Sequence, residues 1–113
     1  MAEINQTLDV IWIGEDVSIP FTLTSTTTPA AWTITIHIKP LTGLEQTSTG
    51  VVSGSAGANP AWTATVTATF LQAKTKLLGP GVAVWQGWRT DSGSVTMLGE
   101  GTIEIRKPRI EIT

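Results

Sequence analysis

Two stretches of the chain alternate strictly between apolar and polar residues, and this period of two constrains the fold more than any other feature. In AWTITIHIKP, the apolar residues of one side are Trp32, Ile34, Ile36 and Ile38. AWTATVTATF repeats the pattern, with apolar residues at the even positions of 62–70 and threonines between them. Because successive side chains of a strand point to opposite faces of a sheet, each stretch predicts a strand with one buried and one solvated face.

The same criterion predicts further strands. DVSIPFTLTS has apolar residues at the odd positions of 17–23, and Pro20, which cannot donate to a ladder, places this strand at an edge or a bulge. Less regular strands are expected at 8–13, 47–53, 82–89 and 95–106. The segments LEQTSTG and SGSAGANP, rich in glycine, serine and polar residues, indicate loops.

Only one segment, LQAKTKLLG, is rich in helix-forming residues, and it predicts a short helix near 71–78. Gly79 is expected to end this helix in the left-handed conformation, with Pro80 preventing its continuation. About seven strands in 113 residues predict an all-β two-sheet sandwich that forms a single domain, 1–113. Its expected core contains Phe21, Trp32, Ile34, Ile36, Trp62, Val66 and Trp85.

Charge and composition argue against several classes of protein. A formal net charge of −2 disfavours a nucleic-acid binder, which needs a basic face to neutralise phosphates. No apolar run approaches the roughly 20 residues that cross a bilayer, so no membrane partner is expected. The opening MAEINQTLDV lacks the basic and apolar regions of a signal peptide, which predicts synthesis in the cytoplasm.

Residues that could carry catalysis are sparse. His37 is the only histidine and there is no cysteine, so we expect no metal site and no cofactor. His37 lies on the polar side of its strand, where a solvated or cross-strand-paired imidazole is the simpler interpretation. Neither pair of carboxylates suits acid–base catalysis, because the backbones of Glu100 and Glu104 would be ~13 Å apart along a strand, and the adjacent Glu15 and Asp16 indicate a turn. We therefore predict that the protein is not an enzyme.

The segment VWQGWRTDSGS, residues 84–94, is the most chemically mixed part of the chain. Residues 91–93 have the composition of a turn, which indicates a hairpin between the last two strands. Arg89 would then stand at the end of a strand, within reach of a loop carboxylate. Trp88 and Arg89 remain candidates for a binding site, and the placement of Trp12 stays open.

Several segments in this order resemble the immunoglobulin-like β-sandwich domains of tailed-phage structural proteins, of which the N-terminal domain of the phage baseplate upper protein is typical. The segments are GEDVSIPFTLT (14–24), WTITIHIK (32–39), LQAKTKLLGPG (71–81), VAVWQGWRTDSG (82–93) and GEGTIEI (99–105). The resemblance implies an immunoglobulin-like two-sheet sandwich without catalytic residues. It also implies a virion structural protein, localised in the virion, whose partners are other virion proteins and copies of itself.

The resemblance also implies which face of the strand at 82–89 is buried. With Ala83, Trp85 and Gly87 inside, the outward residues would be Val82, Val84 and Trp88. Such a patch suits a subunit contact, with Arg89 near its rim. Alternatively, a bulge at Gly87 or the helix at 71–78 would bury Trp88 within its own domain.

The two ends of the chain are candidate interaction segments, at 1–8 and 107–113. After Pro108, RIEIT still alternates, and Ile110 and Ile112 need cover that a small sandwich does not provide. We expect this tail to pack against a neighbouring subunit or a local sheet edge. The alternative function is a carbohydrate-binding or adhesin-type module of the same fold, with Trp12 and Trp88 stacking on sugar rings.

Overall fold

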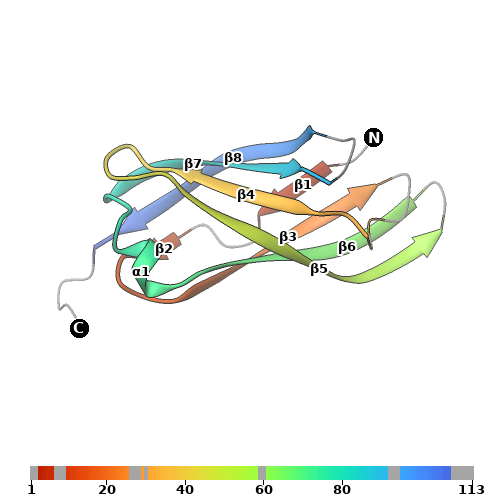
Figure 1. Ribbon diagram of the computed structural model, residues 1–113, viewed down its shortest axis with the longest axis horizontal. Coiled ribbons are helices and arrows are strands. Elements are labelled where there is room, and N and C mark those ends of the chain that lie inside the picture. Colours follow the sequence, from red (N-terminus) through yellow and green to blue (C-terminus); the bar gives the residue numbers. More distant parts are fainter. Residues whose placement is uncertain are drawn as a thin grey trace.

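The computed structural model describes residues 3–6, 10–25, 29, 31–58, 61–91 and 95–107 (Figure 1). These residues form eight strands and one short helix, so the chain is nearly all β, as predicted. In chain order the elements are β1 (Glu3–Gln6), β2 (Val10–Trp12), β3 (Val17–Ser25), β4 (Ile34–Lys39), β5 (Gln46–Ala58), β6 (Ala61–Phe70), α1 (Gln72–Thr75), β7 (Gly81–Arg89) and β8 (Thr96–Arg106).

All eight strands belong to one curled sheet, in the order β1-β3-β6-β5-β4-β7-β8-β2. The strand β5 turns the corner, because residues 46–50 pair with β4 and residues 51–58 pair with β6. The sheet thus has a β6 half, made of β1, β3, β6 and residues 51–58, and a β7 half with the remaining strands. Because β1 also lies against β8, the sheet is nearly closed into a barrel (Figure 1).

The length of β5 corrects two predictions, because most of LEQTSTG and part of SGSAGANP are strand rather than loop. In the second of these segments, glycine permits an irregularity within the strand rather than a loop. The register with β6 shifts between Ser53 and Ala56, and Gly54 adopts a positive φ of 64° in that bulge. Where β5 leaves β6, Ser48 Oγ donates a hydrogen bond to the Thr69 carbonyl at 2.8 Å.

The apolar sides of the two halves face each other and form one core, as the alternation predicted. Phe21, Ile34, Ile36, Val66 and Trp85 are all buried, as expected. The expectation was wrong for two tryptophans, which are only half-buried. Trp32 precedes the first residue of β4, and Trp62 is the second residue of β6, so each lies at the end of the sheet where fewer neighbours can cover a large ring.

An edge strand that the sequence did not indicate closes the core. Residues 3–6, within the expected interaction segment 1–8, pair as β1 with β3 of the same chain. Ile4 is buried over two glycines of the β7 half, Gly87 and Gly99. A Cβ at Gly99 would lie 2.6 Å from the Ile4 carbonyl oxygen, so only glycine permits this approach. The prediction that Pro20 places its strand at an edge or a bulge was wrong, because β3 pairs with β1 on one side and, in an unbroken register, with β6 on the other.

The helix is shorter than the predicted 71–78, since α1 covers only Gln72–Thr75. Gly79 does not adopt the left-handed conformation expected of it. Its N–H instead donates to the Thr42 carbonyl at 2.8 Å, and a Cβ at this position would collide with Thr42. Glycine is therefore required here by a close backbone approach, not by a helix cap.

Candidate functional site

The outward face of β7 carries the predicted apolar patch. Ala83, Trp85 and Gly87 are buried, so the inward side of this strand is the one the resemblance implied. On the other side, Val82 is 59% exposed and Val84 is 44% exposed. Valine side chains at this exposure leave apolar surface in the middle of a sheet face, where polar residues are usual.

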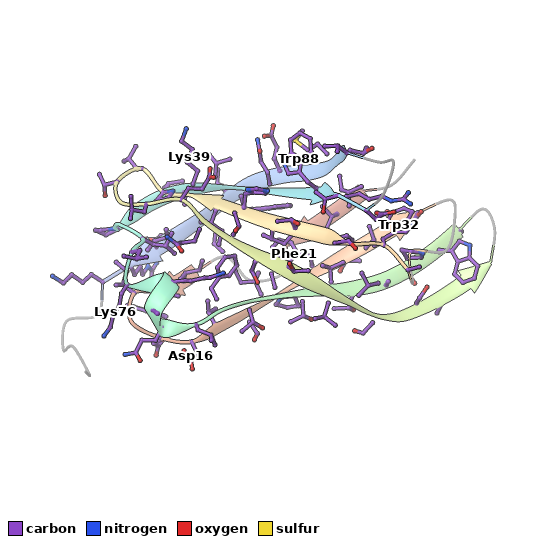
Figure 2. All side chains as sticks on the ribbon, in the orientation of Figure 1. Asp16, Phe21, Trp32, Lys39, Lys76 and Trp88 are labelled. Atoms are coloured by element: carbon purple, nitrogen blue, oxygen red, sulfur yellow. The ribbon has the colours of Figure 1, made fainter. Side chains whose placement is uncertain are left out.

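Trp88 lies on the same outward side and is half-buried. Figure 2 shows Trp88 and Lys39 projecting from one face of the β7 half, away from Phe21 in the interior. The Trp88 Nε1 donates a hydrogen bond to Gln86 Oε1 at 3.2 Å, and Gln86 Nε2 donates to Glu100 Oε2 at 3.2 Å. This chain of hydrogen bonds orients the indole and leaves part of its ring accessible.

Neither alternative for burying Trp88 describes the structure. The register between β7 and β8 does shift beside Gly87, but the extra residue, Leu98, belongs to β8. The helix α1 lies near the other end of β7, where that strand begins (Figure 1). The role of Trp88 in a subunit contact stays a prediction.

Arg89 makes the contact with a loop carboxylate that the sequence indicated. Its Nε lies 2.7 Å from Asp91 Oδ1 and its Nη2 lies 2.9 Å from Asp91 Oδ2. This bidentate hydrogen bond lowers the pKa of Asp91 and raises the pKa of Arg89. The Arg89 Cζ also lies 4.1 Å from the centroid of the Trp32 ring. Arg89 therefore ties the end of β7 to the segment before β4.

A shallow pocket of about 320 Å³ opens beside Val84 on the outward side of β4 and β7. Its lining residues are His37, Lys39, Glu45, Val84 and Gln86. His37 Nδ1 lies 4.0 Å from Glu45 Oε2, and His37 pairs across strands with Gln86 and Thr47. The His37 side chain lies on the outward side of β4 and is 35% exposed, as expected of a partly solvated imidazole, but its neighbour Glu45 belongs to a loop and not to a paired strand. Reasoning from the sequence missed the pocket, because Glu45 reaches it from the loop before β5.

Trp12 lies at the opposite margin of the β7 half and is 39% exposed. The Arg106 Cζ lies 5.8 Å from the centroid of its ring, and Arg106 Nε lies 3.0 Å from Glu104 Oε1. The hydrogen bond from Arg106 lowers the pKa of Glu104. Arg106 thus shares its positive charge between a carboxylate and an aromatic ring.

Two further kinds of site, a metal centre and a membrane-spanning helix, were considered for the described residues. Within those residues, no group of three or more histidine, aspartate or glutamate side chains could hold a metal ion. The same residues contain no helix long and apolar enough to cross a membrane. Ile110 and Ile112 lie outside the described residues.

No family model and no curated protein matches the chain. Among solved structures, it is similar to part of the Pseudomonas fluorescens alkylpurine DNA glycosylase AlkC, which was bound to DNA containing an abasic-site analogue. That match has a TM-score of 0.54 and 23% identity over 93% of this chain and 30% of that chain.

Two structures of a β-glucosidase from Listeria innocua match with TM-scores of 0.46 and 0.44 and identities of 12% and 14%. They cover 98% and 93% of this chain and 16% of each of those chains. The chain thus spans less than a third of the length of each of these three structures. At such identity the likeness to the glycosylase concerns the fold alone.

Proposed function

We propose that the protein is an immunoglobulin-like sandwich that serves as a structural component of a tailed-phage virion. It acts in the virion through contacts with other virion proteins and with copies of itself, without catalysis, cofactor, nucleic acid or membrane. The strand order supports the fold. In an immunoglobulin constant-type domain, strands A, B, E and D form one sheet and C, F and G form the other. The orders β1-β3-β6-β5 and β4-β7-β8 correspond to these two sets.

The observation that carries the function is the apolar outward face of β7. Val82 and Val84 are exposed in mid-strand, and Trp88 continues the same side. Apolar residues gathered in the centre of a polar sheet face are typical of contact surfaces, and tryptophan is a frequent anchor in them. The resemblance of the sequence to phage structural domains supports the virion as the place of contact.

A Trp88→Ala variant tests this proposal. We expect it to melt like the wild type but to be lost from particles when both are supplied during assembly of the parent virion. Incorporation would be measured by quantitative mass spectrometry of purified particles. Trp12→Ala is the matched control, since Trp12 is an exposed tryptophan at the margin of the same half. Equal incorporation of the Trp88→Ala variant, or its unfolding, would contradict the proposal.

The pocket beside Val84 favours a second candidate function, carbohydrate binding. Its lining combines donors and acceptors from His37, Glu45 and Gln86, and Gln86 holds the indole of Trp88 next to it. Planar polar groups beside a partly accessible aromatic ring suit a sugar. A glycan array with the isolated protein, repeated with Gln86→Ala, would detect this function. Absence of binding to every glycan would eliminate it.

A further inference from the structure

The strands β3, β5 and β6 contain no aspartate, glutamate, lysine or arginine. The outward side of β3, β6 and residues 51–58 is instead dominated by hydroxyl groups, and we name it the hydroxyl face. Its hydroxyl residues are Ser18, Thr22, Thr24, Ser53, Thr63, Thr65, Thr67 and Thr69. The β7 half differs, because its outward side carries Lys39, Glu100, Glu104 and Arg106. The strands of the hydroxyl face thus carry no charge of their own, and acidic residues flank it at Asp16, just before β3, and at Glu3 of β1, the register partner of Thr24.

The register arranges the hydroxyl face in rows across the strands. One row joins Thr22, Thr65 and Ser53, and another joins Thr24, Thr63 and Ala56. At the other end, Ser18 Oγ and Thr69 Oγ1 are hydrogen-bonded at 3.0 Å.

Between these rows, Pro20, Thr67 and Val51 form a more apolar row, and Val51 is 66% exposed. An apolar centre with a polar margin is the usual anatomy of a protein contact.

We propose that the hydroxyl face binds the same face of a second copy of this chain. A hydroxyl group both donates and accepts hydrogen bonds, so a surface of hydroxyl groups is complementary to itself. Because β3, β5 and β6 contribute no charged residue, the centre of such a contact brings no like charges together and desolvates no ion. Other partners fit less well. The outward residues of these strands offer no cation for phosphate groups and no aromatic ring for a sugar.

The size of the hydroxyl face indicates a weak contact. Residues 18–24 of β3 span about 20 Å, and three neighbouring strands span about 14 Å. This footprint is smaller than the roughly 800 Å² per partner of a standard interface. Such a contact becomes effective when many copies are held together, because avidity multiplies weak affinities. The inference therefore rests on the proposed role in a multi-copy particle and names one surface that would be used there.

Sedimentation equilibrium of the isolated protein, at concentrations up to about 1 mM, tests the contact. We expect a monomer–dimer equilibrium whose dissociation constant changes less than about twofold between about 50 mM and 500 mM NaCl, because no charged pair contributes. A Thr65→Lys variant should dimerise at least tenfold more weakly, because two ammonium groups would be brought together without counter-charges. A wild type that stays monomeric at all concentrations would overturn the proposal.

Thr102→Lys is the matched control, because Thr102 is an exposed threonine in the middle of β8, on the outward side of the β7 half. Thr102→Lys should dimerise like the wild type. Because both variants replace an exposed strand threonine by lysine, the loss of strand propensity is the same in the two. The opposite result, with only Thr102→Lys monomeric, would overturn this inference while supporting the contact through β7. Loss of particle incorporation by Trp88→Ala with normal dimerisation would leave both proposals standing.

Cross-linking provides a measurement that does not depend on weakened binding. The chain has no cysteine, so a Thr65→Cys variant can form only intermolecular disulfides through that position. Thr65 lies on β6, the central strand of the hydroxyl face, so two faces that meet bring the two thiols near each other. We expect Thr65→Cys to form a covalent dimer under mild oxidation much faster than Thr102→Cys. Equal rates for the two variants would overturn the proposal.

Discussion

The ring of Phe21 in β3 packs against the indole of Trp85 in β7, with centroids 4.9 Å apart and planes tilted by 59°. This pair joins the two halves of the sheet across the core. Trp85 is 2% exposed, and a Cβ at Gly101 would lie 2.8 Å from its Nε1. The indole therefore lies directly on the backbone of β8, in a space that a glycine leaves open.

Trp85→Ala should destabilise the protein by ~3–5 kcal/mol, because it removes this contact and leaves a cavity between the halves. Trp32→Ala should cost clearly less, since the Trp32 ring is only half-buried at the end of the sheet. Urea unfolding followed by fluorescence and circular dichroism would measure both free energies. Equal costs for the two variants would show that Trp32 is a core residue after all.

Gly99→Ala should weaken the attachment of β1, because the added methyl group would collide with the Ile4 carbonyl. We expect a loss of about 1–3 kcal/mol in the free energy of unfolding, as for other overpacked sites. The same substitution should cost much less in a variant that lacks residues 1–6, because the colliding group is then absent. A similar cost in both backgrounds would place the strain elsewhere in β8.

The pKa of Asp91 should lie below the ordinary value for aspartate, because the hydrogen bonds from the Arg89 guanidinium stabilise the charged carboxylate. With its folded pKa lowered, this pair contributes stability above the unfolded pKa and loses it as the pH falls through the folded value. Carbon-detected NMR titration of Asp91 would measure the shift. In Arg89→Gln the pKa of Asp91 should return towards its ordinary value, and an unchanged value would contradict the assignment.

Thr75 is fully buried and ties α1 to the turn before β3. Its Oγ1 donates to the Glu15 carbonyl at 2.9 Å and accepts from the Gly14 N–H at 3.1 Å. Thr75→Val keeps the shape but leaves these two backbone groups without their partner, so it should cost about 1–3 kcal/mol. Thr75→Ser keeps the hydroxyl and should cost less in the same thermal unfolding assay. The reverse order would show that the methyl group matters more than the hydrogen bonds.

The sequence by itself determined which side of each regular strand is buried. Alternation is a local property, and it placed Ile34, Ile36 and Val66 in the core without knowledge of their partners. It also placed Val82 and Val84 outward once the side of Trp85 was chosen. The turn composition after Arg89 correctly indicated a loop carboxylate within its reach, because residues two apart at the end of a strand are near each other in any fold.

Only the tertiary structure decided the features that depend on residues far apart in the chain. The strand β5 is continuous because it pairs first with β4 and then with β6. Those partners are not visible in the local sequence, where the glycines of this segment indicated loops. The burial of Ile4 depends on Gly87 and Gly99, about 80 to 95 residues later, and no local pattern encodes that approach. The half-exposure of Trp32 depends on where the sheet ends. In each case the decisive neighbours are brought together by strand pairing, which a periodicity along one strand cannot specify.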